Sequence, residues 1–214
     1  MLWTSSVLPF MSAFSALFAI IDPFAAIPIF LSLTDRYTEA ERSHVVKKAV
    51  IIACGTLILF ALTGESIFHL FGISIPAFRI AGGILLLKLG VEQLNAQRER
   101  VKLEEENESY AREDISIFPI ATPLLAGPGA ISTVVLQASQ ASGWVASAFF
   151  VLAIVLVFVV SYLLLKSAPY LFRVLGQTGL NLLTRIMGII LTAIAVQFII
   201  DGIVSVWRLA QVPT

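Results

Sequence analysis

A carboxylate stands alone inside the first long apolar run of the sequence. Asp22 is the only charged residue between positions 7 and 33. Near the centre of a membrane helix a carboxylate costs roughly 2.5–3.5 kcal/mol even on lenient insertion scales, so it should be paired, protonated or facing water. Asp22 could therefore hold a proton, a sodium ion or an amine. It could equally cap the half-helix that begins at Pro23, and the two roles are compatible.

Two proline motifs in different parts of the chain share the pattern Pro-x-x-Ala-x-Pro. They read 22-DPFAAIP-28 and 122-TPLLAGP-128. Each should break or kink its helix, and an opened backbone in hydrocarbon is tolerated only where it is buried in protein or lines a cavity. The N–H groups of a new half-helix after Gly127 would suit a carboxylate, and carbonyls released at the breaks would suit a cation, which together favours a zwitterion. The predicted substrate-binding residues of the two motifs are Asp22, Pro23, Ala26, Pro28, Pro123, Ala126, Gly127, Pro128 and Gly129.

A second repeated motif contains arginine. The sequences 79-RIAGGIL-85 and 185-RIMGIIL-191 each follow a proline motif, in the same order and at nearly the same spacing. Arg79 and Arg185 could each stabilise the part of the chain that carries its motif by donating to backbone carbonyls. Each could instead close a gate with an acid such as Asp201 or Glu65, or extend to the membrane–water interface. Gln197, in an apolar stretch, could pack against another helix or bind the solute.

The composition places these motifs on membrane helices. Hydrophobic residues make up 58% of the 214 residues and charged residues 13%, against roughly 45–50% and about 25% in a typical soluble domain. A bilayer core needs roughly 20 helical residues per span. Runs that are apolar on every face favour helices over barrel strands. The predicted class is an all-α integral membrane protein with six transmembrane helices, at 7–33, 45–64, 78–94, 115–138, 144–165 and 182–206.

The order of the motifs predicts two related halves. Residues 1–95 form a first three-helix repeat, 96–114 a cytoplasmic linker with an acidic run, and 115–214 a second repeat. Because each half has an odd number of spans, the second must be inverted in the membrane, as in many secondary transporters, and the first and fourth helices are the broken ones.

The charges indicate the orientation and exclude some functions. Lys and Arg concentrate in the first, third and fifth loops, so these should face the cytoplasm and both termini should lie outside. A net charge of zero argues against nucleic-acid binding. One cysteine and two separated histidines offer neither a disulfide framework nor a zinc site, so no metal or other cofactor is expected beyond a coupling proton or sodium ion.

Four motifs in series resemble the MarC family, also described as SnatA-like neutral amino acid transporters. They are 22-DPFAAIPIF-30, 78-FRIAGGIL-85, 123-PLLAGPGAIST-133 and 178-TGLNLLTRIMGIIL-191, the last followed by 196-VQFIIDGI-203. The resemblance covers nearly the whole chain. It implies a multi-pass protein of a prokaryotic inner membrane that transports small neutral amino acids such as alanine and glycine. Many members carry a Gly-Asn pair where this chain has Ala25 and Ala26, a difference that bears on substrate choice.

The predicted function is secondary transport of a small neutral solute by alternating access. No nucleotide-binding motif exists to drive it, and the loops are too short for an ATPase domain. Two alternatives remain open, a membrane-embedded enzyme acting on lipid and a scaffold that does not transport. We expect no catalytic residues, a small-molecule solute and the lipid bilayer as partners, and an oligomer is compatible with the sequence.

Overall fold

The computed structural model describes residues 2–94, 114–141 and 143–210. Every regular element in these ranges is helical, which confirms the all-α class. The predicted linker, 96–114, lies outside the described residues except for Asp114. The elements in chain order are α1 (Leu2–Ile21), α2 (Pro23–Leu33), α3 (Glu39–Phe71), α4 (Ile75–Leu94), η2 (Ser116–Leu125), α6 (Pro128–Ala138), α7 (Trp144–Lys166) and α8 (Ala168–Ala210).

Several of these helices are long and apolar enough to cross a bilayer. The described ranges contain four such spans, or up to five if η2 and α6 together form one. α4 does not qualify, because its 20 residues include Arg79, Lys88 and Glu92. Six spans therefore remain a prediction. The four spans are Pro9–Leu33, Glu39–Gly64, Trp144–Lys166 and Ala168–Arg208.

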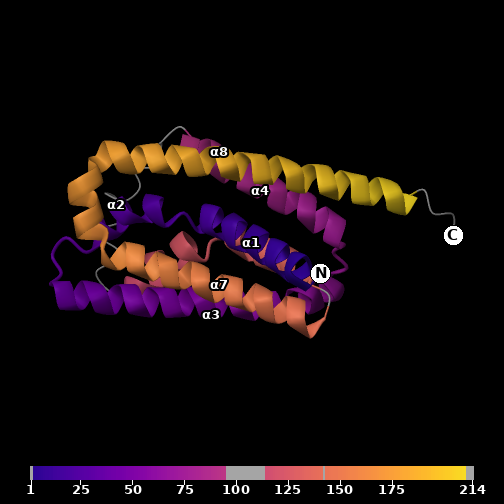
Figure 1. The fold of residues 1–214 in the computed structure, drawn as a ribbon, viewed down its shortest axis with the longest axis horizontal. Helices are drawn as coiled ribbons and strands as arrows, with labels where there is room; N and C mark the ends of the chain where they lie inside the picture. The colour runs from indigo at the N-terminus through magenta and orange to yellow at the C-terminus, as the bar shows by residue number, and fades with distance from the viewer. Residues whose placement is uncertain (1, 95–113, 142, 211–214) are drawn as a thin grey trace.

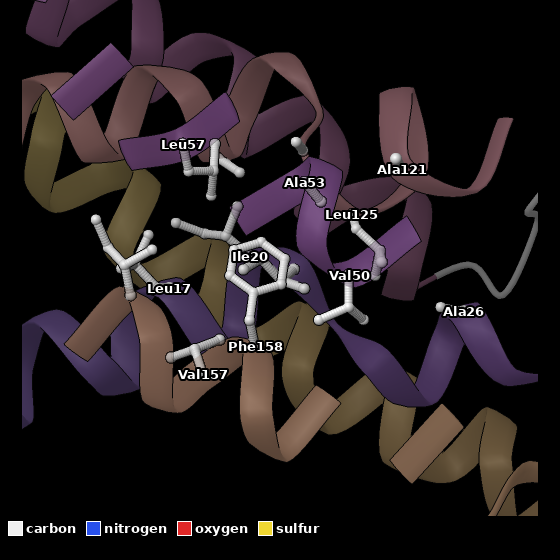
Figure 2. Packing of buried hydrophobic residues seen from close by; sticks show 14 of the residues in the cluster. Leu17, Ile20, Ala26, Val50, Ala53, Leu57, Ala121, Leu125, Val157 and Phe158 are labelled. Atoms are coloured by element: carbon white, nitrogen blue, oxygen red, sulfur yellow. The ribbon is translucent and has the colours of Figure 1, made fainter. Parts of the chain in front are cut away.

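The helices form two outer pairs with the broken segments between them. Figure 1 shows α3 and α7 along one side of the molecule, α4 and α8 along the other, and α1 and α2 between the pairs. Apolar residues of all eight described elements contribute to one buried cluster, part of which Figure 2 shows. Those labelled in Figure 2 are Leu17, Ile20, Ala26, Val50, Ala53, Leu57, Ala121, Leu125, Val157 and Phe158.

Glycines allow α4 and α8 to pack at backbone distance. A Cβ atom on Gly90 would lie 2.9 Å from the Thr192 nitrogen, and one on Gly188 would lie 3.0 Å from the Gly90 carbonyl oxygen. Farther along, a Cβ atom on Gly202 would lie 3.1 Å from the Pro76 oxygen. The start of α4 therefore meets the end of α8, so the two helices run antiparallel. Small residues are the usual means of such close packing between membrane helices.

The second predicted helix, 45–64, is too short at both ends. α3 begins at Glu39 because Thr38 and Glu41 form a capping box, in which the Thr38 N–H donates to Glu41 at 2.7 Å and the Glu41 N–H donates to the Thr38 hydroxyl at 3.3 Å. Its end lies at Phe71, where Gly72 adopts a left-handed φ of 66°. Local capping thus extends the helix past its apolar part.

The sixth predicted helix, 182–206, is also too short. α8 begins at Ala168, since Pro169 is tolerated in the first turn of a helix. Gly176, with φ 61° and ψ −179°, then turns the chain, and Figure 1 shows the first turns of α8 lying across the direction of its long remainder. By contrast, the predicted fifth helix is confirmed as Trp144–Lys166, and α6 ends at Ala138, where the turn before the fifth helix was predicted to begin.

Candidate functional site

The first helix break is centred on Asp22, which is fully buried. Its backbone is left-handed, with φ 42° and ψ 70°, a conformation that Asp tolerates better than most residues. Its carboxylate accepts the N–H of Ala25 at 3.2 Å, its own N–H donates to Phe18 at 3.0 Å, and its carbonyl accepts from Ala26 at 3.2 Å. The break therefore disturbs few backbone hydrogen bonds, and the capping role of Asp22 is confirmed.

The prolines of the first motif have different positions in the helix. Pro23 is buried at the first position of α2, where a missing N–H is tolerated. Pro28 lies inside α2, half-buried, and cannot donate to the Phe24 carbonyl one turn earlier. Ala26 is fully buried between them. The helix thus breaks before the first proline and continues through the second.

The second break is wider and more bent. η2 contains two extended residues, Phe118 and Thr122, each directly before a proline, which is the conformation that proline favours for its predecessor. η2 and α6 meet at 57°. Gly127 occupies the cap position of α6 without a side chain to accept a hydrogen bond. The predicted half-helix beginning at Pro128 is confirmed.

Close backbone packing explains the glycine before this half-helix. A Cβ atom on Gly127 would lie 2.6 Å from the Pro123 carbonyl oxygen, so a larger residue cannot fit without moving the backbone. Pro123 and Pro128 are exposed, whereas Ala126 and Gly129 are buried. Unlike the first break, this one has an accessible side.

The start of α6 packs against the end of α1. A Cβ atom on Gly129 would lie 2.9 Å from Leu89, 3.0 Å from Leu86 and 3.6 Å from Ile20. Ile20 lies two residues before Asp22, and the two leucines belong to α4. The chain just after the second proline motif thus lies beside the chain just before the first, through apolar contacts in the protein interior.

A polar cavity of about 480 Å³ lies where α4 begins and α8 ends. Arg79 enters it from α4, and Gln197 and Asp201 enter it from α8. The Gln197 amide donates to an Asp201 carboxylate oxygen at 2.8 Å. The Arg79 Nε is buried and lacks a hydrogen-bond partner in the described structure. Since the ion pairs among the described residues are Lys48–Asp114 and Lys88–Glu92, Arg79 and Asp201 share the cavity without pairing.

Three further polar residues of the cavity were missed by the sequence reasoning. Ser12 comes from α1, Gln137 from α6 and Gln140 from the turn after it. The signal was present in the spacing, because Gln137 and Gln140 are three residues apart at the end of an otherwise apolar run. Aromatic side chains complete the wall, including Phe10 and Phe149. The cavity thus offers both charges, amides and an apolar surface.

The sequence matches a family model, described as MarC family integral membrane protein, over residues 7–207. The chain belongs to the MarC family. A UPF0056 membrane protein of Methanocaldococcus jannaschii is 45% identical over 91% of this chain and 95% of the relative. The UPF0056 membrane protein YhcE of Escherichia coli is 37% identical over 91% of each, and YvbG of Bacillus subtilis is 38% identical over 89% and 92%. No solved structure gives a significant match.

Membership of the MarC family establishes an integral membrane protein, as the motifs predicted. The relatives' names identify membrane proteins and state no solute. Among the predicted site residues of this MarC-family chain, the structure brings Gln197, Arg79 and Asp201 together in the cavity. Asp22 is not part of its lining. Arg185 is exposed, toward the opposite end of the α4–α8 pair.

A charged pair holds the start of the second broken segment in the MarC-family fold. Lys48 of α3 forms an ion pair with Asp114, just before η2. Asp114 also accepts the Ser116 N–H at 3.0 Å. Hydrogen bonds from Lys48 and then Ser116 lower the pKa of the Asp114 carboxyl from 3.8 to about 2. The described chain before η2 is thereby tied to α3.

Proposed function

We propose that this chain is a secondary transporter that moves small neutral solutes, above all amino acids such as alanine or glycine, by alternating access. The observation that carries the proposal is the cavity in which Arg79 and Asp201 face a common space without pairing. Its volume, about 480 Å³, falls in the ordinary range for small-molecule sites. Opposite charges kept apart in one cavity suit a molecule that carries both.

An amino acid offers a complementary group to each wall of the cavity. Its carboxylate would accept hydrogen bonds from Arg79, including one from the Nε donor, which has no partner among the described residues. Its ammonium would approach Asp201, whose position is fixed by Gln197. A small side chain would contact Phe10 and Phe149. A solute with only one charge would leave the opposite group unpaired, which disfavours binding.

The antiparallel packing of α4 and α8 supports the inverted-repeat part of the proposal. These helices carry the matching Arg-Ile-x-Gly motifs, and the broken segments carry the matching proline motifs. Six spans in two inverted halves would place the two motif pairs about one twofold axis in the membrane plane. Arg79 and Arg185 would then serve equivalent ends of the α4–α8 pair, one for each access state.

Asp22 is the candidate for coupling to an ion. It is a fully buried carboxylate at the break between α1 and α2, packed beside α6 through Ile20 and Gly129. Carboxylates at such positions in membrane helices commonly carry protons or bind sodium. Coupling through Asp22 would leave the cavity residues to recognise the solute.

Counterflow of labelled alanine in liposomes tests the proposal. We expect uptake by the native chain and at least tenfold weaker apparent affinity for Arg79→Gln and Asp201→Asn, because a hydrogen bond to a charged group contributes about 1.5–3 kcal/mol. Competition by two analogues tests which group each residue recognises, because alaninamide lacks the carboxylate of alanine and propionate lacks its ammonium group. Arg79→Gln should reduce the preference for alanine over alaninamide, and Asp201→Asn its preference over propionate.

The matched control is Lys88→Gln, which removes an exposed charge from α4 outside the cavity and should transport normally. Elution as a single monodisperse species shows that each variant is folded. Absence of counterflow for alanine, glycine and a broad panel of neutral solutes by folded native protein would overturn the proposal in favour of a scaffold or an enzyme.

A further inference from the structure

A groove of about 590 Å³ runs between α3 and α7, away from the polar cavity. Both helices are candidate membrane spans. Gly55 leaves the middle of the groove open, since a Cβ atom there would meet nothing within 4 Å. The floor is formed by Val50 and Phe158, both buried. The remaining apolar lining is Ile51, Cys54, Ile58, Val155 and Val159.

One end of this groove is basic. Lys47 and Tyr162 line it there, and the Lys166 ammonium lies 5.7 Å from the centre of the Tyr162 ring. Lys47 forms no ion pair within the described structure, whereas the neighbouring Lys48 pairs with Asp114. Two ammonium groups and a phenol hydroxyl thus gather where the apolar groove ends.

The adjacent cavity adds to this basic end. It has a volume of about 280 Å³ and includes Lys166, Arg42 and one acid, Glu39. Arg42 donates to the Thr34 carbonyl at 2.9 Å and to the Asp35 carbonyl at 3.2 Å, so it is partly engaged in capping α2. Where the groove meets this cavity, the basic residues Lys47, Lys166 and Arg42 still outnumber the single acid of the lining, Glu39.

We propose that the α3–α7 groove binds an anionic phospholipid, with one acyl chain along Gly55 and the phosphate near Lys47, Tyr162 and Lys166. An apolar groove on two membrane spans matches a hydrocarbon chain. Basic pockets between membrane helices are suited to anionic headgroups. A zwitterionic lipid would fill the groove equally well but would leave the two lysines without a net negative partner. The proposal does not depend on transport.

Native mass spectrometry of the full chain, delipidated in detergent and titrated with phosphatidylglycerol or phosphatidylcholine, tests this. We expect tighter binding of phosphatidylglycerol, and a loss of about fivefold in its affinity for each of Lys47→Gln and Lys166→Gln, since each lysine contributes about 1 kcal/mol near an anionic surface. Phosphatidylcholine binding should not change. Gly55→Leu should weaken both lipids, and Lys88→Gln neither. Inorganic phosphate at millimolar concentration should not compete.

Cys54, the single cysteine of the chain, reports on the same groove. Phosphatidylglycerol should slow its reaction with a membrane-permeable maleimide severalfold in native protein, but not in the Lys47→Gln, Lys166→Gln double variant. Equal affinities for the two lipids, or unchanged phosphatidylglycerol affinity in the folded double variant, would overturn the proposal. So would competition by inorganic phosphate, or a Cys54–Cys54 disulfide in native protein, which would place a second copy on this face.

Discussion

The two proline motifs share a pattern but produce different breaks. At the first, Asp22 caps the following helix with its own side chain, the residue is fully buried, and α1 and α2 together still read as one span, Pro9–Leu33. At the second, Gly127 provides no side-chain cap, two prolines are exposed, and the helices meet at 57°. We call the first break the closed joint, because Asp22 is buried and caps α2. We call the second break the open bend, because Pro123 and Pro128 are exposed.

The difference shows that a repeated motif specifies where a helix is interrupted but not how the next helix is capped or how deeply the break is buried. At the first break an aspartate precedes the first proline, and at the second a threonine does. At the first break the aspartate side chain accepts a hydrogen bond from an N–H group in the first turn of the new helix. The second break depends instead on close packing of Gly127 against the Pro123 carbonyl. In the proposed transporter, the closed joint would hold a coupling ion and the open bend would move.

The largest expected effect is at the open bend. Gly127→Ala places a Cβ atom against a backbone oxygen that cannot rotate away, so we expect a loss of up to about 3 kcal/mol in stability. Gly55→Ala is the matched control, because its Cβ atom meets nothing and alanine favours a helix by up to about 1 kcal/mol. Thermal unfolding in detergent measures both. Equal melting temperatures for the two variants would show that the bend tolerates a side chain.

The closed joint should show a smaller, graded effect. Asp22→Asn, Asp22→Gly and Asp22→Ala all remove the charge, so differences among them isolate the cap and the left-handed backbone. Asn keeps the cap and tolerates the left-handed backbone. Gly loses only the cap, which costs a few tenths of a kcal/mol of stability. Ala loses the cap and also strains the backbone, for about 2 kcal/mol in total. We expect thermal stability in the order Asn, Gly, Ala. A different order would mean that Asp22 holds the joint in another way.

Local sequence signals predicted much of this arrangement. The break at Asp22, the start of α6 at Pro128 and the turn before Trp144 all follow from proline, glycine and capping preferences of neighbouring residues. The start of α3 was also available locally, because Thr38 and Glu41 have the spacing of a capping box. These features depend on a few consecutive residues, which is why the sequence alone carries them.

The polar cavity depends instead on tertiary packing. Arg79 and Asp201 are far apart in the chain and line the same cavity only because α4 and α8 are antiparallel with glycines at their contact. The sequence suggested a partnership between them but not that Gln137 and Gln140 would join. Similarly, nothing in the proline motifs indicated that one break would be buried and the other exposed, since burial is decided by the helices packed around each.

The smallest expected effect concerns the charged pair at the start of the open bend. The depressed pKa of Asp114, about 2 against 3.8, means that its ion pair with Lys48 stabilises the fold above about pH 4, and that this contribution is lost as the pH falls toward 2. Because both side chains are about 40% exposed, the contribution should be only a few tenths of a kcal/mol. Lys48→Gln should therefore melt slightly below the native protein at pH 6, and the difference should vanish near pH 2 and shrink in high salt. A difference in melting temperature that persists at low pH would show that Lys48 holds η2 by packing. The stability of the open bend would then depend on the contacts of the Lys48 side chain rather than on its charge.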